Sequence, residues 1–180
     1  MFEDLGVHYL LGGSLASSLH GIPRTTQDAD LVAALEHRHV PLLVEALQRT
    51  FYMDADRMRD AIRRQASFNL IHLSTLTKVD IFVYKADPFS RSEMERRQQI
   101  ELPGGEGSSL LVASAEDTVL QKLRWYVLGG GTSERQWNDI LGVLKVRRAS
   151  LDLPYLRRWA AELELTSLFA KALLESGLED

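Results

Sequence analysis

The stretch LLGGSLA, residues 10–16, joins a short apolar run to a run of helical character through Gly12 and Gly13. This pattern predicts a strand over residues 7–11, a tight turn, and a helix over residues 14–20. Glycines at such a turn let backbone amides approach an anion, and the N-terminal end of the following helix favours negative charge. Because a turn that only reverses the chain has the same signature, the downstream sequence has to decide between phosphate binding and simple chain reversal.

Two aspartates follow in the stretch QDADLV, residues 27–32. Alternate residues of a strand point to one face, so Asp28 and Asp30 are expected to project together from a strand, with Ala29 toward the core. Paired carboxylates repel each other unless a cation lies between them, and their oxygens suit Mg²⁺ or Mn²⁺. A solvent-facing strand end is the alternative interpretation of an isolated Asp-x-Asp pattern.

A third carboxylate, Asp80, lies near the start of an apolar strand predicted over residues 79–84. An unpaired charge in a central strand is costly, so Asp80 needs a partner. If this strand lies beside that of Asp28 and Asp30, the three carboxylates make a site for two metal ions that stabilise a phosphoryl displacement. An edge-strand position or a salt bridge to Lys78 would account for Asp80 without a metal.

Near residue 112 the sequence changes from short apolar runs that alternate with helical stretches to helical stretches alone. Residues 1–112 are expected to form an α+β core with a mixed β-sheet flanked by helices, and residues 113–180 a C-terminal helical region packed on that core. Ser114 is the predicted N-cap of the first helix of that region. Other elements expected are helices over 41–50 and 55–65, strands over 28–33 and 68–73, a strand pair around a loop at 103–107, and helices over 137–146 and from Pro154 and Thr166.

Composition narrows the class of protein. The chain of 180 residues is 45% hydrophobic, enough for a real core, and its formal charge of −4 argues against wholesale coating of nucleic acid. It contains no cysteine, which excludes disulfides and thiolate metal sites and fits a reducing cytoplasm. No apolar run has membrane-spanning length, and the first ten residues lack the features of a secretory signal. We therefore expect a cytoplasmic protein that does not interact with membranes.

The combination of Gly12-Gly13-Ser14, Asp28-Ala29-Asp30 and Asp80 resembles the DNA polymerase β-like nucleotidyltransferase superfamily. The stretch HGIPRTT at residues 20–26 is similar to the branch of AbiEii-type toxins. Ser17 and Ser18 depart from the pattern of minimal nucleotidyltransferase antitoxins, which have Arg-Gly there. Helical motifs of the AbiEii branch are similar to residues 114–122, ending at Lys122, and to Arg135 leading to Asp139.

The resemblance implies a nucleotidyltransferase fold and a pyrophosphate-releasing enzyme that moves a nucleoside monophosphate from a nucleoside triphosphate to an acceptor hydroxyl. It implies RNA or a protein as acceptor, a cognate toxin or antitoxin as partner, and Mg²⁺ or Mn²⁺ as cofactor. The Gly-Gly-Ser turn would hold the β and γ phosphates, and the three aspartates would hold the metals. Arg24 and Lys122 are candidate nucleotide contacts, or else solvated side chains, and Asp139 is expected to pair with a basic residue of a neighbouring helix.

A second class of function stays open at this point. A catalytically silent nucleotide-binding or antitoxin-like interaction module could keep the same fold and the same aspartates. Nucleotidyl transfer distinguishes the two, because only the enzyme moves label from a nucleotide to an acceptor.

Overall fold

The computed structural model describes residues 1–101 and 109–178. The chain forms two compact units. The first, here called the sheet unit, contains Met1–Gly12 and Thr26–Val112; the second, the helical unit, contains Gly13–Thr25 and Ala113–Asp180. Residues 13–25 thus group with the C-terminal helices, and the division into domains at residue 112 stays a proposal.

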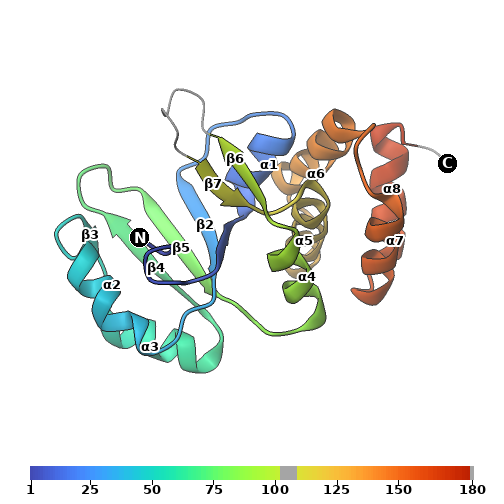
Figure 1. The fold of residues 1–180 in the computed structure, drawn as a ribbon. Coiled ribbons are helices and arrows are strands. Elements are labelled where there is room, and N and C mark those ends of the chain that lie inside the picture. Colours follow the sequence, from blue (N-terminus) through green and yellow to red (C-terminus); the bar gives the residue numbers. More distant parts are fainter. Residues whose placement is uncertain (102–108, 179–180) are drawn as a thin grey trace. The chain divides into compact units, whose positions relative to one another are not determined.

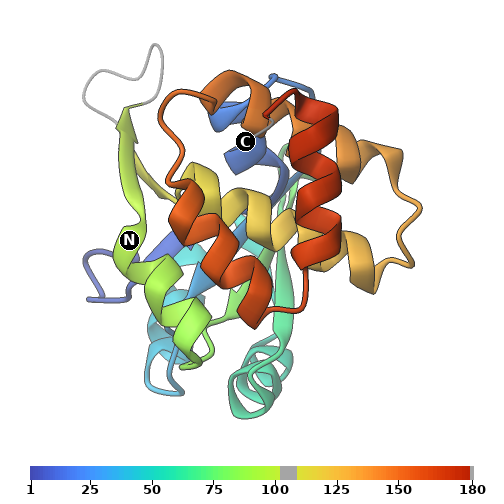
Figure 2. The same cartoon turned by 90° about the vertical axis from the view of Figure 1, so that its right-hand side faces the viewer.

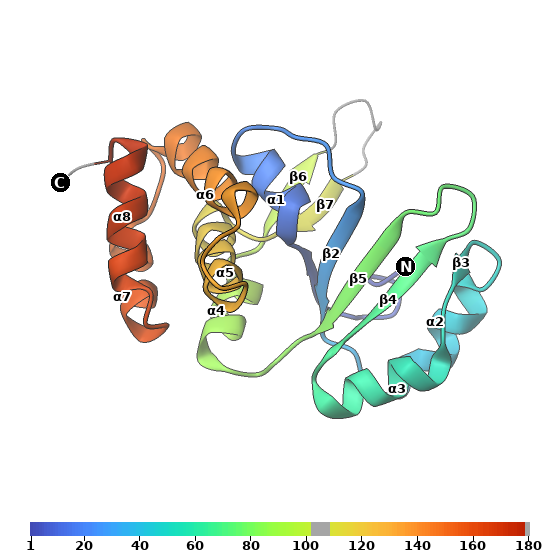
Figure 3. The ribbon, with the colours of Figure 1, turned by 180° about the vertical axis from the view of Figure 1, so that it is seen from behind.

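The described part of the sheet unit forms a seven-stranded mixed sheet with the order β3-β4-β5-β2-β1-β7-β6 (Figure 1, and from behind in Figure 3). β2 and β5 are parallel, as are β1 and β7, whereas the other neighbouring pairs are antiparallel. This arrangement confirms the expected α+β class and mixed sheet. The strands are β1 (Tyr9–Leu11), β2 (Asp28–Ala33), β3 (Phe51–Tyr52), β4 (Ser67–His72), β5 (Lys78–Val83), β6 (Gln98–Glu101) and β7 (Ser109–Val112).

Helices α2 (His39–Leu47) and α3 (Ala55–Arg64) cover one face of this sheet. The Asp54 carboxylate caps α3 by accepting hydrogen bonds from two backbone N–H groups of its first turn. Because strand residues alternate between faces, the residues that pack against α2 and α3 are separated by residues of the opposite face, which include Asp30, Lys78 and Asp80. The buried residues of this core come from both helices and four strands: Val40, Leu43, Met58, Ala61, Phe68, Leu70, Ile81, Val83, Ala33 and Tyr9, with Val7 and Leu35 beside them.

Most elements agree with the sequence prediction to within two residues. The strand over residues 28–33 is confirmed, and β4 and β5 form the expected hairpin. The helix expected from Pro41 begins two residues earlier, because the proline occupies the first turn, where its missing N–H is not needed. The predicted strand pair is confirmed as β6 and β7, whereas the loop between them, at residues 103–107, lies outside the described residues.

Two elements of the sheet unit are not predicted from the sequence. β3 has only two residues, too few for an alternating pattern. Helix α4 (Pro88–Arg96) does carry a start signal, because Asp87 caps it by accepting from the backbone N–H of Ser90 and Pro88 is its first residue. Its arginines and serines obscure the apolar stripe by which a helix is recognised.

The helical unit consists of α1 (Gly13–His20), α5 (Ala115–Leu128), α6 (Glu134–Arg147), α7 (Leu153–Glu162) and α8 (Thr166–Ser176). α5 and α6 both pack against α1, and α7 and α8 lie beside each other at the C-terminal end (Figure 2). The predicted N-cap is confirmed, since Ser114 Oγ accepts from the backbone N–H of Asp117. Across the described residues, none of the helices has both the length and the apolar character to cross a membrane.

Gly21 allows a close approach of α1 and α6. A Cβ atom at this position would lie 2.7 Å from the backbone nitrogen of Val143 and 2.9 Å from the carbonyl carbon of Gly142. Both distances are shorter than real Cβ contacts, and backbone atoms cannot swing away as a side chain would. The packing of the helical unit therefore requires a glycine, which has no Cβ atom, at position 21.

His20, the last residue of α1, is buried in the helical unit. Its Nε2 lies 2.7 Å from the carbonyl oxygen of Ala113, so Nε2 carries the proton and donates it. Arg147 donates to the backbone oxygen of His20 at 3.2 Å and approaches Nδ1 at 3.3 Å. Burial lowers the pKa of His20 and outweighs the hydrogen bond to the Ala113 carbonyl, which raises it; the charge of Arg147 lowers the pKa further, and that of Glu116 raises it slightly.

Acidification is expected to destabilise the helical unit through His20. The folded state keeps this imidazole neutral, whereas the unfolded chain binds a proton below about pH 6.5. Since the unfolded state then binds more protons, the free energy of unfolding falls as the pH is lowered from 7, by at most about 1.4 kcal/mol per pH unit. The three tryptophans, Trp125, Trp137 and Trp159, all lie in the helical unit, so urea unfolding followed by tryptophan fluorescence measures this effect.

His20→Gln should remove most of this pH dependence, while His37→Gln, at an exposed position of the sheet unit, should leave it intact. A stability that stays constant between pH 7 and pH 5.5 in the wild type would contradict the assignment.

Candidate functional site

The sheet unit brings the three predicted aspartates onto two neighbouring strands. In the parallel register of β2 and β5, Asp30 lies opposite Asp80 and Asp28 lies opposite Lys78. All four residues occupy the face opposite the α2–α3 core, because they alternate with core residues along each strand. The condition set by the sequence, that the Asp80 strand should lie beside the strand of Asp28 and Asp30, is confirmed.

Lys78 is the partner that Asp80 needs. Its Nζ lies 2.8 Å from Asp80 Oδ2, with 42% of the Lys78 side chain and 24% of the Asp80 side chain exposed. The hydrogen bond to Asp80 raises the pKa of Lys78 against the opposing effect of burial, and the charges of Asp80, Asp28 and Asp30 raise it further. The central position of β5 excludes an edge-strand explanation, whereas the salt bridge that the sequence left open is present.

Asp28, Asp30 and Asp80 are here called the aspartate face. Their carboxylate oxygens fit a hard divalent cation. Carboxylate oxygens on adjacent strands are ligands that Mg²⁺ and Mn²⁺ take up, and Asp28, Asp30 and Asp80 would be the residues that hold it. The part of the chain that the structure describes has no three His, Asp or Glu side chains already arranged to hold a metal ion. Lys78 occupies one oxygen of Asp80, so the fit requires this ion pair to open.

The glycine turn has the predicted strand-turn-helix form. Gly12 follows β1, and its N–H donates to the backbone oxygen of Asp30 at 2.8 Å. A Cβ at Gly12 would lie 3.9 Å from that same oxygen, an ordinary van der Waals distance, so this contact does not itself demand a glycine. Gly13 begins α1 with a φ of 58°, a left-handed conformation that L side chains rarely adopt.

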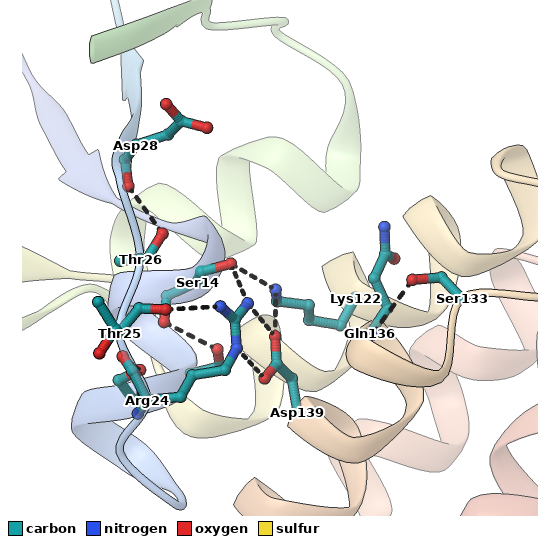
Figure 4. Close-up of polar contacts among 11 residues, drawn as sticks. Ser14, Arg24, Thr25, Thr26, Asp28, Lys122, Ser133, Gln136 and Asp139 are labelled. Atoms are coloured by element: carbon teal, nitrogen blue, oxygen red, sulfur yellow. Dashed lines mark hydrogen bonds and ion pairs between the residues drawn. The ribbon is translucent and has the colours of Figure 1, made fainter. Parts of the chain in front are cut away.

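The helical unit gathers two cations around one serine and one carboxylate (Figure 4). Arg24 Nη2 donates to Ser14 Oγ at 2.6 Å, and Lys122 Nζ donates to the same oxygen at 3.3 Å. Arg24 also donates two hydrogen bonds to Asp139, from Nε to Oδ1 at 2.7 Å and from Nη2 to Oδ2 at 2.9 Å. Lys122 Nζ donates to Asp139 Oδ2 at 2.7 Å. These four residues, here called the Ser14 cluster, come from α1, the segment after it, α5 and α6.

Asp139 is the buried anchor of the Ser14 cluster. Only 5% of its side chain is exposed, against 9% for Lys122 and 26% for Arg24. Burial by itself raises the pKa of Asp139, but the hydrogen bonds from Arg24 and Lys122, together with their charges, outweigh burial and hold the pKa below its usual value. Asp139 is therefore a carboxylate that keeps two positive side chains in place.

The three aspartates of the sheet unit and the residues of the Ser14 cluster differ in how far the sequence alone predicts their contacts. Asp28, Asp30 and Asp80 are found from alternation and from the cost of a charge in a strand. The expected pairing of Asp139 with a basic residue of a neighbouring helix is confirmed by Lys122, but the second partner, Arg24, lies 115 residues away and no local pattern signals it. The sequence left open that Arg24 and Lys122 are solvated side chains. In the structure both side chains form ion pairs with Asp139 instead.

Comparisons with known proteins give the fold. No protein-family model and no curated protein matches the sequence. A nucleotidyltransferase-like antigenic protein from Paracoccidioides brasiliensis is 17% identical with a TM-score of 0.56, over 96% of this chain and 86% of that one. The antibiotic-resistance factor ANT(2'')-Ia is 13% identical with a TM-score of 0.54, over 99% and 92% of the two chains.

The lincosamide antibiotic adenylyltransferase LnuA is 14% identical with a TM-score of 0.47, over 81% of this chain and 90% of that one. None of these three structures is described as an AbiEii-type toxin, so that branch stays a proposal. The first two matches each extend over nearly the whole described chain. The protein therefore has the fold of nucleotidyltransferase-like proteins.

Proposed function

We propose that the protein is a metal-dependent nucleotidyltransferase that moves a nucleoside monophosphate from a nucleoside triphosphate to an acceptor hydroxyl. The observation that carries this proposal is the parallel register of β2 and β5, which sets Asp30 opposite Asp80 and places Asp28 two residues away along β2 on the same face. Three carboxylates on one face of two central strands have a structural cost that a bound cation would offset. The nucleotidyltransferase-like fold is consistent with this chemistry but does not by itself establish it.

Each group of residues has a role in the proposed reaction. The acceptor hydroxyl oxygen forms a bond to the α-phosphorus, the bond from that phosphorus to the β-phosphate oxygen breaks, and pyrophosphate leaves. Asp28 and Asp30 would bridge the metal ions, while Asp80 would hold the catalytic one and help take the hydroxyl proton. Bound Mg²⁺ or Mn²⁺ would supply neutralisation of the charge that develops on the phosphates.

The Ser14 cluster, with Gly12 and Gly13, is proposed to hold the β and γ phosphates. Ser14 Oγ already accepts from Arg24 and from Lys122. A hydroxyl has two acceptor positions and one proton, so both acceptor positions are used and the proton is left for a further acceptor. A phosphate oxygen fits this requirement, and the two cations that Asp139 holds match its charge.

The acceptor is proposed to be an RNA end or a protein hydroxyl, in a toxin-antitoxin or phage-defence system of the AbiEii-like kind, with a cognate toxin or antitoxin as partner. This assignment rests on the resemblance of residues 20–26 and of the helical motifs to that branch. Because ANT(2'')-Ia is an antibiotic-resistance factor, hydroxylated antibiotics belong among the acceptors to be tested.

A catalytically silent nucleotide-binding or antitoxin-like module is the second candidate. The observation in its favour is the ion pair of Lys78 with Asp80, which neutralises part of the aspartate face without any metal. In such a module, the aspartates and Lys78 would have a purely structural role.

Transfer of label decides between the two candidates. The purified protein is incubated with Mg²⁺ or Mn²⁺, each α-labelled nucleoside triphosphate in turn, and transfer RNA, cell extract or hydroxylated antibiotics. The wild type is expected to label an acceptor and release pyrophosphate, and Asp28→Asn/Asp30→Asn is expected to do neither. Metal-dependent nucleotide binding without transfer would favour the silent module, while equal transfer by the double variant would contradict the proposed mechanism.

A further inference from the structure

Lys78 is placed among three carboxylates of the sheet unit. It contacts Asp80, two residues further along β5, at 2.8 Å, and it lies opposite Asp28 in the register with β2. Asp30 belongs to the same face and contributes to the electrostatic environment of the lysine. The ammonium is thus the near counter-charge of the whole aspartate face.

The charges of this face leave room for a divalent cation only if Lys78 moves. Three carboxylates and one ammonium carry a net charge of about −2 at neutral pH. A metal ion bound to Asp80 beside the ammonium would experience a repulsion that rises as their separation falls. The Lys78 side chain is 42% exposed and flexible enough to swing into solvent.

We infer that Lys78 is an internal competitor for the metal site: its ammonium occupies Asp80 in the metal-free protein and has to leave before Asp80 can bind a divalent cation. This inference rests on the proposed metal-binding role of Asp28, Asp30 and Asp80. In the metal-free state, the Lys78 ammonium reduces the repulsion between the carboxylates. The same ammonium weakens the affinity of the site for metal in the absence of a nucleotide, whose phosphates would add metal ligands.

Metal titration without nucleotide tests this competition. The full chain is stripped with EDTA, exchanged into metal-free buffer and titrated with Mn²⁺, and free Mn²⁺ is measured by electron paramagnetic resonance. Lys78→Met is expected to bind Mn²⁺ roughly tenfold more tightly than the wild type, because a like charge within a few ångströms of the site has been removed. Lys78→Arg, which keeps the charge, should bind as the wild type does.

Lys85→Met is the matched control. Lys85 is an exposed lysine of the same unit, so its replacement changes the net charge of the protein equally. It is expected to change the Mn²⁺ affinity less than twofold, since an exposed charge away from the site is screened by salt.

Hydrogen exchange in EDTA gives a second readout that does not depend on metal affinity. Without its counter-charge, the Lys78→Met protein should exchange the amides of β2 and β5 faster than the wild type, and added Mn²⁺ should restore protection. In the wild type, Mn²⁺ should have a smaller effect on the same amides, because the ammonium already neutralises part of the face.

The outcomes separate this inference from the proposed function. Wild-type Mn²⁺ binding that is lost in Asp80→Asn but unchanged in Lys78→Met would overturn the competition and keep the metal site. An equal gain in Lys85→Met would reduce the effect to net charge and overturn the competition as well. If none of the proteins binds Mn²⁺, both the inference and the metal part of the proposed function are wrong.

Discussion

Asp80→Asn is expected to lower the rate of nucleotidyl transfer by about a thousandfold or more, on the order of 4 kcal/mol in the activation barrier. The substitution keeps the size and shape of the side chain but removes the negative charge that would hold a metal ion and the basic oxygen that would take the hydroxyl proton. Single-turnover transfer from an α-labelled nucleoside triphosphate measures the rate. Binding of the nucleotide, measured separately, should fall much less, since the Ser14 cluster is unchanged.

Asp56→Asn is the control for this substitution. Asp56 lies in the first turn of α3, and its side chain is 94% exposed and paired with Arg59. The same chemical change there should leave the transfer rate within about twofold of the wild type. Equal rates for Asp80→Asn and the wild type would show that Asp80 has no part in the chemistry.

Asp139→Asn is expected to destabilise the helical unit by about 3 kcal/mol, because it leaves the ammonium of Lys122 buried without its counter-charge. The Lys122 side chain is only 9% exposed, so it cannot recover hydration without a rearrangement of α5 and α6. The NH2 group that replaces one carboxylate oxygen cannot accept, so the hydrogen bonds that this oxygen accepts are lost as well. Urea unfolding followed by tryptophan fluorescence reports the helical unit directly.

Removing the buried charges together should cost less than removing one. Lys122→Met/Asp139→Leu replaces the buried ion pair by apolar side chains, and Arg24, which is 26% exposed, can turn toward solvent. We expect this double variant to be more stable than Asp139→Asn while losing affinity for nucleoside triphosphates. A double variant that is less stable than Asp139→Asn would show that the pair contributes through its hydrogen bonds rather than through charge compensation.

The carboxylates of the candidate site could be predicted from the sequence because their signals are local. Asp28 and Asp30 share a face by strand alternation, and Asp80 stands out as a charge inside an apolar strand. The contact between the two strands could only be stated as a condition, since 44 residues lie between the end of β2 and the start of β5 and nothing local fixes strand order. The register of Asp30 with Asp80 is therefore information that the structure adds.

The residues that modify these groups could not be predicted to the same extent. Lys78 appeared only as an alternative partner of Asp80, because its proximity to Asp28 depends on the same long-range register. Arg24 and Lys122 meet at Asp139 from three distant segments, and each of them alone has the appearance of a surface residue. Helix α4 is not predicted for a different reason, since its charged residues leave too weak an apolar periodicity.

The interleaving of the two units constrains how a protein of this kind can be dissected or recombined. A fragment made of residues 113–180 would lack α1, and α1 contributes the buried residues Ala16, Ser17 and His20. Such a fragment would expose the surfaces of α5 and α6 that α1 covers, including the backbone that Gly21 approaches. The C-terminal helices consequently do not form an independent domain by themselves. Chimaeras that exchange the helical unit have to include residues 13–25 together with residues 113–180.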